Sequence, residues 1–253
     1  MKIKRLLKNI LYPIIALLLF IAIWAIIAYV ENKPLVIPQV NYIFDSLFSL
    51  IQTKTAWIAV GNTLLDTLSA FLLSTVIALL MSILTTIFPF IHKIVNPFNT
   101  ILRSAPTMAV IMLSVIWLNY NKVPIFIGFL IAFPLLYSMF REALVTVDSN
   151  LLKMSNVFNV SKKEKLINIY IPSVLPNMLA SCQTVVSLTC KVVIAAEVMA
   201  YVNNTIGFEM FMANFMIETD ILLAYTILAI LLSFFLEFIF AILKKIAEVK
   251  YGY

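Results

Sequence analysis

The sequence is poor in charge. Asp, Glu, Lys and Arg make up only 12% of its 253 residues, while 63% of the residues are hydrophobic. A typical soluble domain is about a quarter charged and about half apolar. One core could not shield so many apolar side chains from water, whereas a bilayer solvates them directly. The shortage of charge therefore excludes an ordinary soluble domain and predicts an all-α integral membrane protein, with a single transmembrane domain over residues 1–253.

Cysteine and histidine are also scarce. Cys182 and Cys190 lie eight residues apart in one apolar run, which on a helix is roughly 12 Å and too far for a disulfide. The one histidine, His92, falls in a short loop, where we expect it to be solvated. No cluster of His, Cys or paired carboxylates supports a metal site or the chemistry of a membrane-bound enzyme. No G-x-x-x-x-G-K-[ST] segment supports a nucleotide site, so we expect no cofactor bound by this chain.

The net charge of +6 does not indicate a nucleic-acid partner. Most basic residues sit beside apolar segments, as expected of a chain that contacts the lipid bilayer. The first apolar run, Ile10–Val30, spans roughly 31 Å as a helix, which is longer than the core of a signal peptide. We expect it to be a retained membrane span.

The apolar runs predict about six transmembrane helices. Their expected ranges are 10–30, 62–88, 101–118, 123–140, 174–202 and 221–243. Pro106 predicts a kink or a late helix start in the third span, because proline removes a backbone donor. A short amphipathic helix is expected over 40–51. A stripe of small residues in the second span predicts close contact with a neighbouring helix; its members are Ser69, Ala70, Ser74, Ala78 and Ser82.

Charge asymmetry orients the six spans. With six spans both termini lie on one side, and that side carries fourteen of the eighteen Lys and Arg residues. The opposite side carries three, Lys33, Lys54 and Lys122, and Lys191 lies within a span. Lys and Arg accumulate on the cytoplasmic side of a membrane. We therefore expect both termini to be cytoplasmic in a multi-pass protein of the cell membrane.

The segment 141–172 is the largest predicted cytoplasmic loop. It has too many apolar residues for a disordered segment, and they recur at near-helical spacing. Ser161 and Glu164 have the spacing of a capping box. We expect two short amphipathic helices joined by a turn at Asn159-Val160. An exposed apolar patch in such a loop indicates a protein partner, although a basic helical segment resting on anionic lipid is the alternative.

The spacing of this loop resembles the coupling loop of permease subunits of binding-protein-dependent ABC importers. That motif reads E-A-A, three residues, G, nine residues, I-x-L-P. Aligning its proline with Pro172 places the motif without a gap on Lys153-Met154-Ser155, Asn159, Ile169 and Ile171. Glu is replaced by Lys153 and Gly by Asn159. Asn is the next best residue after Gly for a left-handed turn, whereas Lys153 reverses a charge.

Other segments resemble the importer subfamily for nitrate, sulfonates, taurine and thiamine precursors. They are Pro34–Pro38, Leu102–Thr107, Ile194–Glu197 and Gly207-Phe208. The resemblance implies a type I permease fold and a transported solute of one of these kinds, either a small anion or a heterocycle. It also implies a second permease copy, forming a homodimer, and an extracellular substrate-binding protein. Cytoplasmic ABC ATPase subunits would use ATP and Mg and dock on the loop, with Leu152 and Phe158 among the contacts.

Two charged residues lie well inside a predicted span. Charged residues within a membrane are functional by default, so Glu197 and Lys191 are candidates for the pathway or the subunit interface. The alternative is that each pairs with a polar group on another helix. Met108, Met112 and Trp117 are further pathway candidates, although such residues in a span more often face lipid or core.

A secondary transporter or channel driven by an ion gradient is the competing class of function. It would need repeated halves or more intramembrane charge than this chain shows.

Overall fold

The computed structural model describes residues 2–31 and 33–251, with side chains described from residue 11 onward except Ser149 and Lys162. The elements in chain order are α1 (Lys2–Glu31), α2 (Val40–Ile51), α3 (Lys54–Ile87), α4 (Pro89–Ser104), α5 (Thr107–Trp117), the 3-10 turn η1 (Tyr120–Lys122), α6 (Val123–Val145), α7 (Ser149–Val157), α8 (Lys162–Lys165), the π-helical turn η2 (Leu166–Tyr170), α9 (Ile171–Ala200), α10 (Ile206–Phe215) and α11 (Thr219–Tyr251). Within the described residues the fold is therefore all-α, as predicted.

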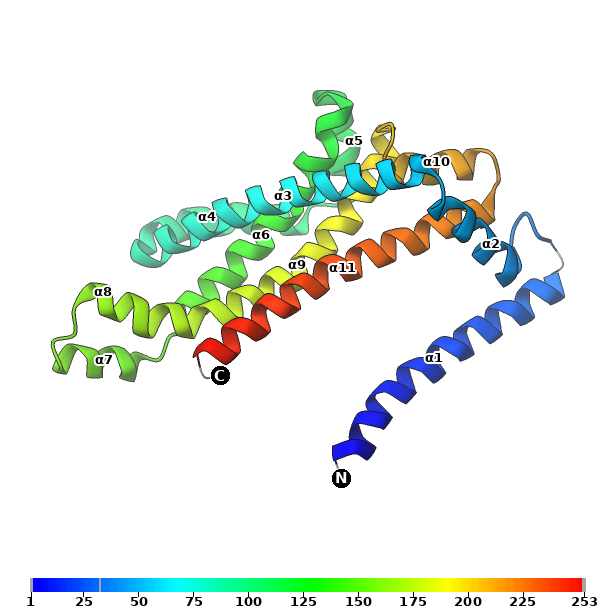
Figure 1. Cartoon of the computed structure of the whole chain (residues 1–253). Coiled ribbons are helices and arrows are strands. Elements are labelled where there is room, and N and C mark those ends of the chain that lie inside the picture. Colours follow the sequence, from blue (N-terminus) through cyan, green and yellow to red (C-terminus); the bar gives the residue numbers. More distant parts are fainter. Residues whose placement is uncertain (1, 32, 252–253) are drawn as a thin grey trace.

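Five described helices are long and apolar enough to cross a membrane, and a bent pair brings the number to six. The five segments are Leu11–Glu31, Lys54–Ile87, Tyr120–Val145, Lys163–Ala200 and Thr219–Tyr251. The pair is α4 and α5, which meet at an angle of 97°. The prediction of about six spans is confirmed when the bent pair is counted as one span. In Figure 1 the C-terminal end of α11 lies toward the same end of the molecule as the α7–α8 loop, whereas the N-terminal end of α1 lies below the bundle, apart from both.

The third predicted span, 101–118, is not one continuous helix. Ala105 has an extended backbone (φ −66°, ψ 134°), because a residue before proline is disfavoured in the helical region. The helix restarts at Thr107, after Pro106, so the predicted break is confirmed. The eleven residues of α5 span only about 16 Å, roughly half of a bilayer core.

Two helices lie where the sequence suggested loops. Helix α4 begins with Pro89 at its first position, where proline is favoured. It carries His92, whose Nδ1 lies 3.0 Å from the Tyr137 hydroxyl, so the expectation of a solvated loop histidine is wrong. Helix α10 begins after Thr205, whose hydroxyl accepts a hydrogen bond from the backbone N–H of Phe208. This cap was the sequence signal for a helix within the polar stretch 203–220.

The bundle core is built on α3, α6, α9 and α11. Helix α3 packs on α6 and α9, and α9 packs on both α6 and α11. Four of the five predicted small residues of α3 are fully buried, namely Ala70, Ser74, Ala78 and Ser82, whereas Ser69 is exposed. The buried stripe lets the neighbouring backbones approach closely. By contrast, α1 lies apart from the other long helices and is almost wholly exposed, as a lipid-facing helix can be (Figure 1).

Gly128 marks the closest approach in this core. A Cβ atom at this position of α6 would lie 2.7 Å from the Cβ of Ala70 on α3 and 2.9 Å from Cγ2 of Val193 on α9. Contacts this short force the helices apart. Three of the central helices therefore meet at a point that only glycine fits.

The variant Gly128→Ala should be less stable than the wild type, by about 1–3 kcal/mol, because the added methyl group overpacks the three-helix contact. Gly61→Ala is the matched control, since a Cβ at Gly61 of α3 meets nothing within 4 Å. There the change should be neutral or stabilising by about 0.5–1 kcal/mol. Thermal unfolding of the purified protein in detergent would measure both, and equal stability of the two variants would contradict this account of the core.

Candidate functional site

The coupling-loop candidate has the turn that its sequence predicts. Helix α7 ends at Val157, and Asn159 follows with φ 51°, in the left-handed region. The turn is closed by the backbone N–H of Val160, which donates to the carbonyl of Ser155 at 2.9 Å. Asparagine tolerates this conformation better than other residues with a Cβ. Asn159 therefore preserves the backbone shape that glycine would supply at the aligned motif position.

The predicted capping box is also present. The backbone N–H of Ser161 donates to Oε2 of Glu164 at 3.1 Å, and the backbone N–H of Glu164 donates to Oγ of Ser161 at 3.3 Å. Across the turn, Nζ of Lys165 donates to Oδ1 of Asn156 at 2.5 Å. These contacts hold α7 against the start of α8, so the loop has a defined shape.

The second loop helix is not a separate short element. Helix α8, the π-helical turn η2 and α9 follow one another without a break from Lys162 to Ala200. Ile169 lies in the π turn, and Ile171 and Pro172 form the first turn of α9. Figure 1 shows the resulting helix running from the loop end through the bundle. The loop is therefore rigidly joined to the fifth span.

The projecting surface of α7 carries an apolar patch. Val157 and Phe158 are 77% and 73% exposed, and Met154 is also exposed. Lys153 is exposed, Leu152 is half-buried and Ser155 is buried. Some of the predicted docking residues are therefore accessible to a partner, whereas others pack inside the loop. Helix α7 protrudes from the bundle end in Figure 1. An apolar patch on such a projection is suited to contact with another protein.

Glu197 lies in a buried polar cluster of three helices. Its side chain is 0% exposed. Oε2 accepts hydrogen bonds from Oγ1 of Thr63 on α3 at 2.9 Å and from the backbone N–H of Gly207 on α10 at 3.0 Å. Thr63 Oγ1 also accepts from the backbone N–H of Ile206 at 3.0 Å. The carboxylate thus joins α3, α9 and α10 within one subunit.

Lys191, in contrast to the buried Glu197, lies on an exposed surface of α9. It is exposed and lines a cavity of about 380 Å³ between α9 and α11, together with Ser187 and Ser233. Glu237 of α11 lines the same cavity. Sequence inspection did not single out Glu237, although an acidic residue within the sixth predicted span was the available signal. The structure thereby places two opposite charges on one intramembrane cavity.

The remaining pathway candidates lie elsewhere. Met108, Met112 and Trp117 are all exposed on α5, and none of them lines the Lys191 cavity. The structure therefore does not bring the five predicted pathway residues together into one site.

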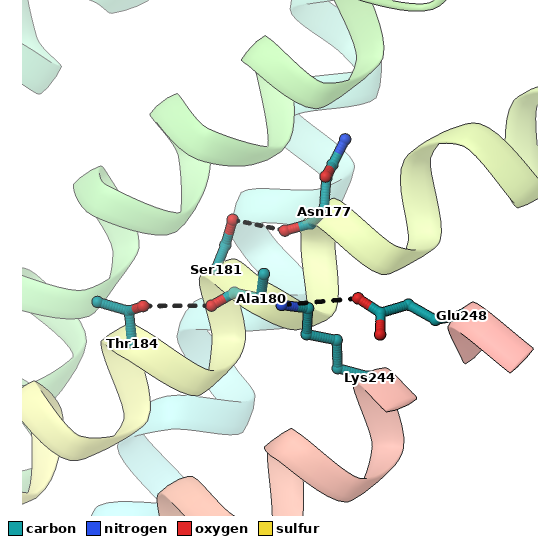
Figure 2. A network of polar contacts seen from close by, with 6 residues as sticks. All are labelled: Asn177, Ala180, Ser181, Thr184, Lys244 and Glu248. Carbon is teal, nitrogen blue, oxygen red and sulfur yellow. Dashed lines mark hydrogen bonds and ion pairs between the residues drawn. The ribbon is translucent and has the colours of Figure 1, made fainter. Parts of the chain in front are cut away.

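A series of polar residues precedes Lys191 along α9. Figure 2 shows Asn177, Ser181 and Thr184 on successive turns; the Ser181 hydroxyl donates to the Asn177 carbonyl at 2.9 Å, and the Thr184 hydroxyl donates to the Ala180 carbonyl at 3.3 Å. These residues and Glu142 of α6 line a second cavity of about 380 Å³. Polar residues thus follow one face of α9 from its loop end to Lys191.

No group of three metal-ligating side chains occurs within residues 2–31 and 33–251. Cys182 and Cys190 are both free and buried, as expected from a spacing too long for a disulfide.

Glu197→Leu should destabilise the fold strongly, because it leaves the Gly207 N–H and the Thr63 hydroxyl without an acceptor, at about 1–3 kcal/mol for each. Glu197→Gln should be much milder, since the amide oxygen can accept both hydrogen bonds. Glu209→Leu on α10 is a control that removes a half-buried carboxylate outside this cluster. Thermal unfolding in detergent would rank the variants, and wild-type stability of Glu197→Leu would refute the structural role.

Comparison with known proteins agrees with this geometry. Residues 74–247 match the family model described as "Binding-protein-dependent transport system inner membrane component". A predicted ABC transporter permease protein of Methanocaldococcus jannaschii is 24% identical over 240 residues, covering 92% of this chain and 88% of that protein. The nitrate import permease protein NrtB of Synechococcus elongatus is 24% identical over 204 residues, covering 76% of this chain and 73% of its own length.

The fold is also shared with a solved transporter. An inward-facing structure of the MetNI methionine ABC transporter superposes with a TM-score of 0.65 at 14% identity, covering 75% of this chain and 94% of that chain. Together with the apolar helices, these matches place the protein in the cell membrane as a multi-pass protein. The chain belongs to the family of binding-protein-dependent transport system inner membrane components, the permease subunits of ABC importers.

Proposed function

We propose that this permease imports a small solute delivered by an extracellular binding protein, while a separate ATPase hydrolyses ATP with Mg in the cytoplasm. The observation that carries the proposal is the α7–α8 loop, which exposes an apolar surface and continues without a break into α9. A partner that moves α7 would therefore move the fifth span with it. The chain itself has no enzymatic role in this scheme.

The orientation of the loop supports a cytoplasmic ATPase. Fourteen of the eighteen Lys and Arg residues belong to the predicted cytoplasmic side. The loop and the C-terminal end of α11 lie toward one end of the molecule (Figure 1). We infer that this end faces the cytoplasm.

A second copy of the chain completes the proposed transporter. By the family resemblance, two permeases form the pathway between them and each receives one ATPase. The relatives' names include a nitrate permease and a methionine transporter, which supports a small polar solute as cargo. A secondary transporter driven by an ion gradient is the alternative, and the two differ in their energy source.

Purified permease should retain an ATPase subunit, and proteoliposomes containing both should take up solute only with ATP and the binding protein. Uptake that follows an ion gradient and ignores ATP would overturn the proposal. This experiment tests the function as a whole, and the following variants test the docking surface.

Val157→Asp or Phe158→Asp should weaken retention of the ATPase by at least tenfold, because each places a charge on the apolar docking surface. Val249→Asp is a matched control, since Val249 is also 77% exposed but lies near the end of α11. Co-purification measures retention, and membrane insertion should be unaffected in all three variants. If the loop variants kept the ATPase as well as the control does, α7 would not be its docking site.

Asn159→Gly should support wild-type ATPase coupling, whereas Asn159→Val should impair it. Glycine adopts the left-handed conformation freely, but a β-branched residue there costs at least about 1–2 kcal/mol and shifts α7 away from α8. The measurement is ATP hydrolysis per molecule of solute transported in proteoliposomes. Equal coupling in both variants would show that the turn does not position the docking surface.

A further inference from the structure

We propose that the cavity between α9 and α11 is an intramembrane binding site for a small zwitterion, with the acid group of the solute at Lys191 and its ammonium group at Glu237. This inference rests on the proposed function and narrows the class of solute that the transporter carries. Lys191 and Glu237 both lie outside the loop that resembles the family motif.

The geometry separates the two charges along the cavity. Helices α9 and α11 run antiparallel, so Ser187 and Glu237 lie at the loop-facing end of the cavity, while Ile194 and Thr226 lie at the other end. Lys191 is four residues beyond Ser187, about 6 Å further from the loop. An ammonium donor and a carboxylate acceptor are thus offset within one cavity of about 380 Å³.

The two charges do not neutralise each other directly. Among the residues that the structure describes, the one ion pair within 4.0 Å joins Lys244 and Glu248, near the end of α11 (Figure 2). Charged groups at membrane depth are costly unless they meet water, a counter-charge or a ligand. A solute carrying both an acid and an ammonium group would give Lys191 and Glu237 each a counter-charge at the same time.

The walls favour a zwitterion over a simple anion. An inorganic anion would gain from Lys191 but would be repelled by Glu237 in the same cavity. The hydroxyls of Ser187 and Thr226 already donate to backbone carbonyls of their own helices, at 3.3 and 2.8 Å. Their free lone pairs can still accept hydrogen bonds, which suits an ammonium group. Cavities of this size hold small organic molecules.

We infer a route from the site toward the loop end. Polar residues of α9 continue from Lys191 and Ser187 to Thr184, Ser181 and Asn177, and the last three line the second cavity. A charged solute that leaves Lys191 would follow this face, because the exposed faces of α11 around the site are apolar, as at Phe234 and Phe238.

The test measures solute binding in lipid nanodiscs without ATP, on the permease together with the subunits that it retains. The probes are the twenty standard amino acids and 2-aminoethanesulfonate, each compared with an analogue that lacks the amino group and one whose acid group is blocked as an ester or amide. The variants are Lys191→Gln and Glu237→Gln, with Lys244→Gln and Glu248→Gln as matched controls outside the cavity. Calorimetry gives affinity, and thermal unfolding without solute checks that each variant is folded.

At least one zwitterion should bind the wild type, and both of its analogues should bind at least tenfold more weakly. Lys191→Gln and Glu237→Gln should each lose at least tenfold in affinity, while the controls bind like the wild type. The loss of the amino group should have little further effect in Glu237→Gln, because its counter-charge is already gone.

Three results would overturn the site: no binding by any probe, binding unchanged in both cavity variants, or equal binding of a zwitterion and its analogues. The double variant Lys191→Glu/Glu237→Lys adds a further check. If it restored stability lost in the single variants while probe binding stayed independent of both residues, the two charges would be a structural pair. Failure of the proposed function would instead appear as loss of ATPase retention or of ATP dependence, which this binding assay does not measure.

Discussion

The hydrocarbon of a bilayer offers no hydrogen bonds, so every polar group within a span must find its partner inside the protein. The Glu197 carboxylate meets this constraint through one oxygen: Oε2 accepts from a side chain of α3 and from the backbone of α10, while Oε1 has no hydrogen-bond partner among the described residues. One acidic side chain thereby fixes three helices relative to one another. The same constraint makes Lys191 and Glu237 informative, since they line an open cavity without a direct ion pair among the described residues.

Helix α9 connects the parts of the molecule that bear on transport. Its N-terminal extension through η2 and α8 forms half of the proposed coupling loop, its polar face carries Asn177, Ser181 and Thr184, and Lys191 lies further along. Glu197 anchors its far end to α3 and α10. A displacement of the loop would therefore act on the polar face and the Lys191 cavity through one continuous helix. The close contact at Gly128 holds α9 against α6 and α3 while leaving its polar face free.

The pairing of Lys191 with Glu237 changes the expected chemistry of the solute. From sequence, the resemblance to permeases for nitrate, sulfonates, taurine and thiamine precursors suggested a small anion or a heterocycle as the solute. With Glu237 on the same cavity, a solute of mixed charge fits better than a simple anion, because both walls then have a counter-charge. In the proposed transporter, a second copy of the chain would complete the pathway, and the binding protein would deliver the solute to it.

Several features followed from the sequence alone, because they depend on neighbours along the chain. The membrane class follows from composition, the break at Pro106 from the missing backbone donor, and the turn at Asn159 with the Ser161–Glu164 capping box from local hydrogen bonding. The loop that we propose for coupling was recognisable for the same reason, since its spacing is set by one turn between two helices. Its continuity with α9 was not, because a π-helical turn has no simple sequence signal.

Only the tertiary structure decided which helices meet. Helices α4 and α10 are short and partly polar, so their stability depends on the bundle on which they pack. The partners of Glu197 come from residues 134 positions before it and 10 positions after it, a separation that no local pattern encodes. Glu237 and Lys191 share a cavity because α9 and α11 pack antiparallel at one particular rotation about their axes. The sequence placed charges within the membrane, and helix packing determined that one charge would join three helices while two others would line a cavity.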